Sequence, residues 1–431
     1  MNLSEQSLQY VWHPCSQMAR LSSVPPLGIK SGKGGWVFDE HGNRYFDAIS
    51  SWWVNLLGHS NERINAAIKH QLDNLPHVML AGCTHEPVVK LAARLSERTA
   101  RNLGHVFFAS DGSSAVEIAL KQSFHYWRQC GEVDRTEFVC LSGSYHGETL
   151  GALSVTDVPL FRDAYGPLLL AGLTVQAPDS RLGNEEQALA EMSELLSTRS
   201  GQISAVIVEP RIQGGAGMVM HSVNYLKKVR ALTRQHNVHL IADEIAVGCG
   251  RTGSFFAWDQ VDRENWPDML LLSKGITGGN LPLSLVMTTD KIFEAFLDND
   301  FKKGFLHSHS YTGNPLACAA ANAVLDHFDE GLEEQIRIQA DSIRESFAHF
   351  DSEPRIGNLR QCGMVLAFDV AGVIENFAEK FHLAAREHEL LIRPIGQTVY
   401  VMPPFVIDKD LSQHIGSAVT KTLHEVLSNA H

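Results

Sequence analysis

Lys274 and Asp243 each follow a short apolar run, and these two residues are the strongest candidates for catalysis in the sequence. Lys274 stands after the run MLLLS (269–273), and Asp243 stands after HLIA (239–242). Such runs predict buried strands of an α/β sheet, and open sheets gather reactive residues beyond the carboxyl ends of their strands. Burial would lower the pKa of the Lys274 amine, and an unprotonated amine can form an imine with an aldehyde. The ordinary alternative is a solvated loop lysine.

Glu209 ends a third apolar run, AVIV (205–208), so three ionisable groups are expected at one edge of the sheet. A carboxylate such as Asp243 can pair with a pyridinium nitrogen and keep it protonated, so that the ring withdraws electrons from a substrate carbanion. The alternatives for Asp243 are a helix cap and a buried ion pair. An amine and a carboxylate in this arrangement suit a covalently bound pyridoxal phosphate, which is the cofactor that the sequence predicts.

A phosphate site is predicted at ASDGSSAVE (109–117), where a strand ends, a Gly-Ser turn follows and a helix begins. Ser114 and Glu117 have the spacing of a capping box. Free backbone amides and the helix dipole favour an anion there, and the hydroxyls of Ser113 or Ser114 could add hydrogen bonds. An ordinary capped helix is the more common outcome for such a pattern taken alone.

Four other residues have side chains suited to binding a cofactor or a substrate. Tyr145, in GSYHG (143–147), could place its ring beside the cofactor, because the glycines allow close backbone approach. Arg393 has a planar fork that fits a carboxylate, although a structural ion pair is equally plausible. Trp52 and Trp53 belong either to a packed core or to the wall of a partly polar cavity, where an aromatic face could hold a cation.

His307 and His309 are separated by one residue, so on a strand both rings would face the same way, as metal ligands can. No third or fourth ligand accompanies them at a suitable spacing. We therefore expect hydrogen-bonded loop residues here and no metal site.

The elements that must position these residues alternate between strands and helices. Continuously apolar runs at 105–109, 138–141, 205–208, 239–242 and 269–272 are separated by helical patterns. This alternation predicts an α/β fold with a mainly parallel sheet covered on both faces, formed by residues 61–324. Residues 325–431, with helical patterns at 333–350 and 411–427 and a strand at 364–368, should form a smaller α+β domain. Residues 1–60 should form an amino-terminal segment that packs with it.

Length and composition disfavour several classes of protein. A chain of 431 residues exceeds one compact core, so two lobes with a cleft between them are expected. With 36 Lys and Arg against 49 Asp and Glu, the net charge is −13 and no basic stripe is present, which disfavours nucleic acid as a partner. Seven cysteines without a Cys-x-x-Cys pair, no signal-like amino terminus and no run that could span a bilayer predict a cytoplasmic protein that does not bind membranes.

Taken in order along the chain, six motifs resemble those of the class III aminotransferases of fold type I: SWW (51–53), DGSSAVE (111–117), GSYHG (143–147), ADEI (242–245), GRTG (250–253) and SKG (273–275). The resemblance spans nearly the whole chain, and its motifs are highly specific. It implies a large domain with a mainly parallel sheet of the seven-stranded type, a smaller α+β domain and pyridoxal 5'-phosphate as cofactor.

The resemblance also implies roles for individual residues at the cofactor. Lys274 would form the Schiff base with it, Asp243 would pair with its pyridinium nitrogen and Tyr145 would stack on its ring. Gly112 and Ser113 would bind its phosphate. These roles agree with the chemistry that the residues suggest by themselves.

A loop and a substrate pocket are implied in the same way. Residues 307–310 would lie against the cofactor of a neighbouring subunit, with Ser310 at its phosphate and the His309 backbone beside it. A homodimer with shared active sites follows from this arrangement. Substrates would contact a set of residues from several segments: Cys15, Trp52, Trp53, Tyr145, Lys274, Ser308 and Arg393.

Further motifs resemble the branch of this class that acts in biotin synthesis: VWHP (11–14), HVM (77–79), GNPLAC (313–318), IRP (392–394) and YVMPP (400–404). That branch transfers the amino group of S-adenosylmethionine to 8-amino-7-oxononanoate, which becomes 7,8-diaminopelargonate. The alternatives are a class III enzyme that uses lysine, ornithine, 4-aminobutyrate or a similar ω-amine, an aminomutase on the same scaffold, and a non-catalytic pyridoxal phosphate binder.

Three positions near the expected substrate pocket depart from some members of the family. Cys15 stands in place of a tyrosine, Ser308 in place of a glycine and Glu148 in place of an aspartate. Loss of a phenol at position 15 removes a hydrogen-bonding group and part of the pocket wall. Recognition of the amino donor is therefore the inference that depends most on these three residues.

Overall fold

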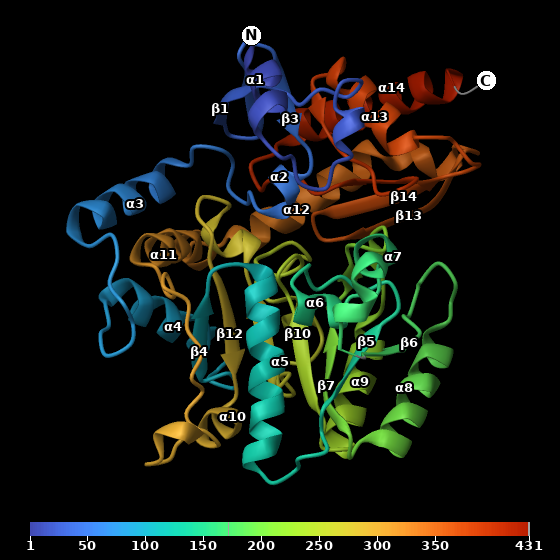
Figure 1. Cartoon of the computed structure of the whole chain (residues 1–431). Helices are drawn as coiled ribbons and strands as arrows, with labels where there is room; N and C mark the ends of the chain where they lie inside the picture. The colour runs from blue at the N-terminus through green and yellow to red at the C-terminus, as the bar shows by residue number, and fades with distance from the viewer. Residues whose placement is uncertain (171, 430–431) are drawn as a thin grey trace. The chain divides into compact units, whose positions relative to one another are not determined.

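The structure is a computed structural model that describes residues 1–170 and 172–429, and its chain divides into two compact units. The sheet unit contains Glu62–Ile336. The terminal unit combines Met1–Asn61 with Arg337–His431, so both ends of the chain belong to it (Figure 1). The division between the units falls within helix α12 (Leu332–Ser346).

A sheet of seven strands forms the centre of the sheet unit, with the strand order β4-β12-β11-β10-β7-β5-β6. All of its strands run parallel except β12, which pairs antiparallel with both of its neighbours. The predicted α/β fold with a mainly parallel sheet is thus confirmed, while β6 and β12 are strands that the sequence did not reveal. The strands are β4 (His105–Ala109), β5 (Glu137–Leu141), β6 (Leu173–Val175), β7 (Ile203–Val208), β10 (His239–Asp243), β11 (Met269–Leu272) and β12 (Ser284–Thr288).

The four central strands of this sheet are covered on both faces. Every residue of β7, β10, β11 and β12 is buried, and the side chains of a strand alternate between its two faces. Helix α5 (Gly112–Gln129) contacts all four of these strands, and α9 (Val223–Gln235) contacts β10. Figure 1 shows α5 standing in front of the sheet. The continuous apolar runs of the sequence therefore mark the buried centre of the fold.

The remaining elements of the sheet unit surround this centre. A small two-stranded sheet pairs β8 (Ile212–Gln213) with β9 (Val219–Met220). Helix α11 packs against α3 and α4. The helices are α3 (Glu62–Asn74), α4 (Glu86–Arg98), α6 (Leu150–Ser154), α7 (Pro159–Arg162), α8 (Glu185–Arg199), α10 (Asp290–Glu294) and α11 (Pro315–Asp329).

The terminal unit has two sheets, with the strand orders β1-β2-β3-β15 and β13-β14-β16. Strand β15 pairs in parallel with β3, so segments from the two ends of the sequence share one sheet. Its helices are α1 (Leu3–Tyr10), α2 (Ser50–Trp53), α13 (Phe377–Arg386) and α14 (Lys409–Ser428). Its strands are β1 (Ile29–Lys33), β2 (Trp36–Asp39), β3 (Arg44–Asp47), β13 (Ile356–Cys362), β14 (Val365–Val370), β15 (Leu390–Leu391) and β16 (Thr398–Val401). Among the described residues, no helix is both long enough and apolar enough to cross a membrane.

Candidate active site

Three parallel strands bring Asp243, Glu209 and Lys274 to one edge of the sheet. Asp243 is the last residue of β10, Glu209 follows β7 directly, and Lys274 follows β11 after one serine. The carboxyl ends of parallel neighbours meet at the same edge, so these side chains converge. The charges of both carboxylates act on the Lys274 amine. The predicted convergence of three ionisable groups is therefore present in the structure.

Lys274 combines a strained backbone with a desolvated amine. It opens a short turn, Lys274–Thr277, and has a positive φ of 45°. That conformation costs a residue other than glycine about 1 kcal/mol or more, so its surroundings must hold it in place. Burial lowers the pKa of the amine, although the charges of Asp243 and Glu209 oppose that shift. A lowered pKa increases the fraction of unprotonated, nucleophilic amine near neutral pH.

His146 anchors the carboxylate of Asp243. Nδ1 of His146 lies 2.7 Å from one Asp243 oxygen, and both side chains are buried. The other oxygen accepts a hydrogen bond from the Ile245 amide at 3.1 Å. The sequence indicated His146 only as a neighbour of Tyr145 in GSYHG, and its partner stands 97 positions further along the chain. The structure thus adds a positioning residue that sequence reasoning missed.

Glu209 fixes the backbone that leads to Tyr145. Its two carboxylate oxygens accept hydrogen bonds from the amides of Tyr145 and Gly214, each at 3.0 Å. Burial raises the pKa of Glu209 to about 7, while the His146 ring and these amides act in the opposite direction. The third ionisable group of the sheet edge is therefore structural, and it holds the loop that bears Tyr145 and His146.

Asp111 caps helix α5, so the predicted capping box of Ser114 and Glu117 is wrong. The Asp111 carboxylate accepts hydrogen bonds from the Ser114 amide at 3.0 Å and from the Ser114 hydroxyl at 2.8 Å. Glu117 instead accepts from an amide of α6. The amides of Gly112 and Ser113 have no acceptor within the part of the chain that the structure describes. Two free amides at the start of an 18-residue helix form a site for an anion.

Glu148 connects Tyr145 to Ser113 through two hydrogen bonds. The Tyr145 hydroxyl donates to Glu148 at 2.9 Å, and the Glu148 amide donates to the Ser113 hydroxyl at 3.3 Å. Gly147 has a φ of 121°, and a Cβ there would collide with the Ser113 hydroxyl, so only glycine fits this position. Glu148, one of the three departures from the family, therefore links the predicted stacking residue to the predicted phosphate site.

The loop at 307–310 lies on the surface of the sheet unit. Ser308 and Ser310 are exposed. Nδ1 of His309 lies 3.2 Å from the Ser110 hydroxyl, and Nδ1 of His307 lies 2.9 Å from Nζ of Lys121. Both histidines are hydrogen-bonded loop residues, as predicted, and the described residues contain no group of three or more potential metal ligands.

In the terminal unit, α2 is a left-handed turn. All four of its residues have positive φ values, between 47° and 73°, at a cost of about 1–2 kcal/mol for each residue other than glycine. The buried carboxylate of Asp47 stabilises the turn, because it accepts from the Ser51 amide at 2.8 Å and from the Ser51 hydroxyl at 2.7 Å. Nε2 of His59 lies 3.0 Å from the same carboxylate. No glycine in the sequence signals this conformation.

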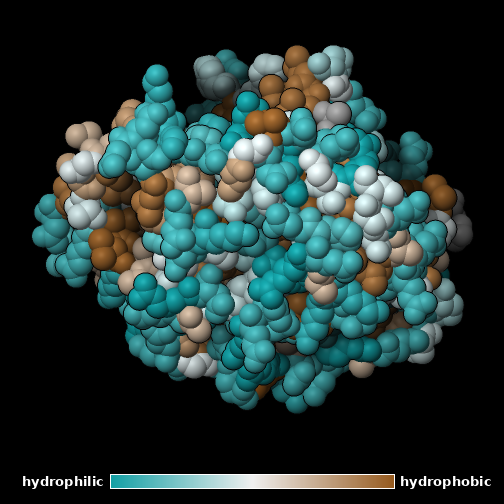
Figure 2. Space-filling view, turned by 90° about the horizontal axis from the view of Figure 1, so that it is seen from below, coloured by the Kyte–Doolittle hydropathy of each residue, from teal (hydrophilic) through white to brown (hydrophobic). Residues whose placement is uncertain are grey.

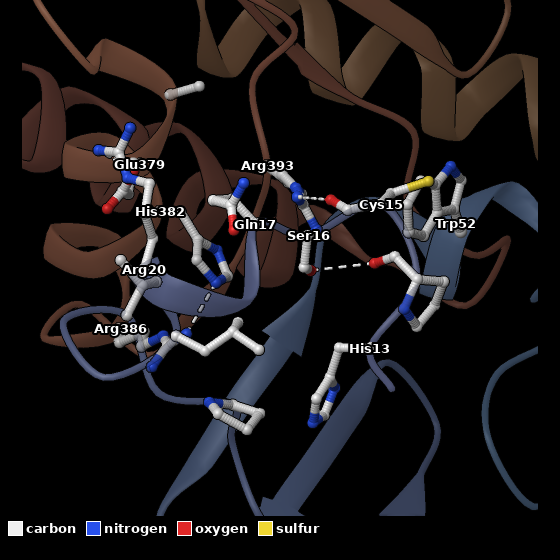
Figure 3. A pocket seen from close by; sticks show the side chains of 15 residues that line it. His13, Cys15, Ser16, Gln17, Arg20, Trp52, Glu379, His382, Arg386 and Arg393 are labelled. Atoms are coloured by element: carbon white, nitrogen blue, oxygen red, sulfur yellow. Dashed lines mark hydrogen bonds and ion pairs between the residues drawn. The ribbon is translucent and has the colours of Figure 1, made fainter. Parts of the chain in front are cut away.

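The left-handed turn places the side chains of the two tryptophans in different environments. Trp53 is buried, and its indole N–H donates to the Tyr400 hydroxyl at 3.0 Å. Trp52 is 48% exposed and lines a cavity of about 490 Å³ within the terminal unit (Figure 3). The sequence left open whether the pair forms core or cavity wall, and the structure gives one tryptophan to each.

Arg393 and Cys15 line the same cavity as Trp52. The guanidinium of Arg393 donates to the backbone carbonyl of Cys15 at 3.3 Å and lies 5.6 Å from the centre of the Trp52 ring. Among the described residues, Arg393 contacts the Cys15 carbonyl and the Trp52 ring and forms no ion pair with a carboxylate, so the alternative of a structural ion pair is not found. Three of the predicted substrate residues are thus brought together in this unit.

The chain belongs to the class-III aminotransferase family, which it matches over residues 17–423. It is 42% identical over 436 residues to the adenosylmethionine-8-amino-7-oxononanoate aminotransferase of Helicobacter pylori, a match that covers 99% of this chain and 98% of that protein. The Aquifex aeolicus protein of the same name is 35% identical over 435 residues, covering 96% and 95% of the two chains.

Solved structures agree with this assignment. The adenosylmethionine-8-amino-7-oxononanoate aminotransferase from Methanocaldococcus jannaschii superposes with a TM-score of 0.92 at 33% identity, covering 98% of each chain. The ω-transaminase from Pseudomonas jessenii, solved in complex with PMP, superposes with a TM-score of 0.94 at 25% identity, covering 100% of this chain and 99% of that one. The predicted family and fold are confirmed.

Proposed function

We propose that this chain is a pyridoxal phosphate-dependent aminotransferase of biotin synthesis. It transfers the amino group of S-adenosylmethionine to 8-amino-7-oxononanoate and produces 7,8-diaminopelargonate. The observation that carries the proposal is a Lys274 amine of lowered pKa, held near Asp243 and Glu209, in a chain that matches enzymes of this name over nearly its full length.

The residues of the sheet unit fit pyridoxal phosphate. Lys274 would hold the cofactor covalently, and the anchored Asp243 carboxylate would meet its pyridinium nitrogen. The free amides of Gly112 and Ser113 would bind its phosphate, and the Tyr145 ring would stack on its plane. The bound pyridoxal ring supplies an electron sink for the substrate carbon, which no amino-acid side chain can provide.

Lys274 also moves the proton in this proposal. Its Nζ would act as the general base that removes the α-proton of the substrate and holds that proton for return. Asp243, fixed by His146, would hold the proton of a pyridinium nitrogen beside it. The same residues act again in the reverse sense when the acceptor receives the amine, so both half-reactions depend on them equally.

The residues of the terminal unit select the substrate. Arg393 would bind the far carboxylate of 8-amino-7-oxononanoate, whose aliphatic chain would lie along Trp52. Trp53 would support that wall from the protein interior. Cys15 offers its carbonyl to Arg393, so its backbone orients the guanidinium while its thiol replaces a larger side chain. Together with Ser308, these residues would distinguish one amine from another.

We further propose a cytoplasmic homodimer in which His309 and Ser310 reach the cofactor site of the partner subunit. Large apolar side chains are exposed around the loop that bears them: Met79 by 62%, Leu306 by 61% and Tyr311 by 66%. The Tyr311 ring lies 4.9 Å from that of His77, which places segment 77–79 beside the loop. Exposed apolar groups of this kind mark interfaces. Figure 2 shows apolar groups at the left edge, the top and the right edge of a face that is mostly hydrophilic.

Product formation tests the proposed function. The cofactor-loaded protein is incubated with S-adenosylmethionine and 8-amino-7-oxononanoate, and 7,8-diaminopelargonate is measured by mass spectrometry. We expect product from the native chain and from a control variant, Lys228→Ala, which removes an exposed lysine. Lys274→Ala should form none while keeping its circular dichroism spectrum. Steady product formation by Lys274→Ala would overturn the assignment.

A further inference from the structure

The cavity of the terminal unit has a basic lining that its own carboxylate does not neutralise. Arg20, Arg386 and Arg393 line it, with Glu379 as the one carboxylate among the described lining residues. Arg20 and Glu379 form an ion pair at 2.6 Å. Two guanidinium charges therefore remain, in a chain whose net charge is −13. Figure 3 shows Arg386 beside His382 at the left, and Cys15 and Trp52 at the right, with Arg393 between them.

Both groups that hold Arg386 are uncharged. Its guanidinium donates to the Pro25 carbonyl at 3.1 Å and to Nε2 of His382 at 2.8 Å. Nδ1 of His382 donates to the Ile392 carbonyl at 2.7 Å, so Nε2 is left as the unprotonated acceptor. Burial lowers the pKa of His382 to about 4, which keeps the ring neutral near pH 7. Arg386 is thus oriented firmly, and its charge is not compensated.

The guanidinium of Arg386 also keeps unused donors. It has five N–H groups, and Nε is buried with no hydrogen-bond partner in the described part of the chain. Arg386 is partly buried, and a buried charge without a counter-charge lowers the stability of the folded state. Arg393 has a comparable arrangement, because its hydrogen-bond acceptor, the Cys15 carbonyl, is uncharged as well. An anion in the cavity at each guanidinium would supply the counter-charge that it lacks.

We propose that this cavity binds an aliphatic carboxylate through Arg386, at a subsite additional to Arg393. The planar fork of arginine binds a carboxylate through two parallel hydrogen bonds. Apolar residues favour an aliphatic chain over a phosphorylated ligand, and the cavity volume is typical of a small-molecule site. The apolar lining comprises Leu21, Val24, Pro26 and Ala378. A chain with a carboxylate at each end offers one to each guanidinium, because both arginines line the same cavity.

Heptanedioate is a direct probe of this subsite. We would titrate it by calorimetry into the cofactor-loaded, full-length protein, and we expect saturable binding. Arg386→Gln should weaken that binding by at least about tenfold, since it removes a charge-assisted pair of hydrogen bonds. The double variant Arg20→Gln/Glu379→Gln removes an ion pair from the same lining without changing its net charge, and it should change the affinity by less than about twofold. Absence of saturable binding, or equal weakening in both variants, would overturn the proposal.

A second variant keeps the test decisive if Arg386→Gln does not fold. Arg386→Lys retains the positive charge but not the fork, and thermal unfolding shows whether it is folded. We expect its affinity for heptanedioate to be lower than that of the native chain but higher than that of a site without a positive charge at position 386. Native affinity in a folded Arg386→Lys variant would contradict binding through the guanidinium fork.

Steady-state kinetics identify the source of the carboxylate, and this step rests on the proposed function. A raised KM for 8-amino-7-oxononanoate with an unchanged KM for the donor in Arg386→Gln would identify the acceptor as the ligand. An unchanged KM with weakened heptanedioate binding would identify a separate aliphatic acid. Calorimetry needs no turnover, so a different amino donor would contradict the proposed function and leave the carboxylate subsite intact.

Discussion

The two units build their functional residues in different ways. In the sheet unit, Asp243, Glu209 and Lys274 stand at the ends of parallel strands, and the sheet itself determines where they lie. In the terminal unit, Trp52 stands on a left-handed turn and Arg393 is held by a backbone carbonyl. Under the proposed function, the chemistry shared by both half-reactions would lie on a rigid scaffold. Substrate selection would lie on local turns and loops, which can vary without disturbing that scaffold.

The largest effect is expected at the centre of the sheet unit. Lys274→Arg keeps a positive charge but cannot supply an unprotonated amine, so both half-reactions should slow by at least about 10³-fold. Rapid-mixing measurements of each half-reaction would check this. A loss confined to one half-reaction would break the distinction between the two units.

His146→Ala should have the next largest effect, about 10²-fold on each half-reaction, because the Asp243 carboxylate loses its anchor. The measurement is the single-turnover rate with the donor and with the acceptor. Restoration of part of the rate in His146→Gln, whose amide can donate a hydrogen bond, would support a positioning role. Full activity in His146→Ala would contradict it.

Arg393, in the terminal unit, should affect only the half-reaction of the acceptor. Arg393→Ala should raise the KM for 8-amino-7-oxononanoate by about tenfold or more, because it removes a charge-assisted contact to the carboxylate. The half-reaction of the donor should stay within about twofold of the native rate. Equal losses in both half-reactions would argue against a carboxylate-specific role.

Asp47→Asn tests the left-handed turn. Loss of the carboxylate weakens its bonds to Ser51 and His59, so Trp52 should be presented less firmly. We expect a rise of several-fold in the KM for the acceptor and a decrease of about 1–3 kcal/mol in the free energy of unfolding.

Asp39→Asn is a matched control for this variant, because Asp39 is another buried carboxylate of the same unit and bonds the His41 and Asn43 amides. It should lower stability without changing the KM. The same KM in Asp47→Asn and in Asp39→Asn would show that the turn does not present Trp52.

Glu209→Gln should have the smallest effect on turnover, and its measurable effect should be on the pH dependence of stability. The Glu209 pKa of about 7 lies above the ordinary value of 4.5, so protonation stabilises the folded state at low pH. That contribution is complete below about pH 4.5 and is lost as the pH rises through 7. The difference in unfolding free energy between the native chain and Glu209→Gln should therefore change across this interval. Denaturant titrations at pH 5 and pH 8 that gave the same difference would contradict it.

The sequence predicted the sheet and its reactive edge because both follow from short-range patterns. Apolar runs marked β4, β5, β7, β10 and β11, and the ionisable residues stand at the ends of three of these strands or within two residues of them. Strands β6 and β12 were missed, because β6 has only three residues and the apolar stretch of β12 is bounded by a serine and a threonine. The cap of α5 was misplaced because Asp111, three residues before Ser114, is an equally good cap and stands closer to the strand end.

Residues that act through distant partners could not be predicted. His146 needs Asp243, and Arg386 needs Pro25 at a separation of 361 positions. The turn of α2 runs against local preference, because four residues other than glycine adopt positive φ and a buried carboxylate from β3 holds them there. Contacts of this kind join residues that are far apart in the sequence, so short-range sequence patterns do not reveal them.

The identity of the amino donor is the central claim, and a single-turnover experiment tests it most directly. The cofactor-loaded protein is mixed separately with S-adenosylmethionine, lysine, ornithine and 4-aminobutyrate, and the amino group transferred to the protein is measured by its later delivery to 8-amino-7-oxononanoate. We predict delivery of about one amino group per active site after S-adenosylmethionine and none after the other amines. Delivery after lysine or another ω-amine, with none after S-adenosylmethionine, would contradict the proposed reaction and keep the aminotransferase.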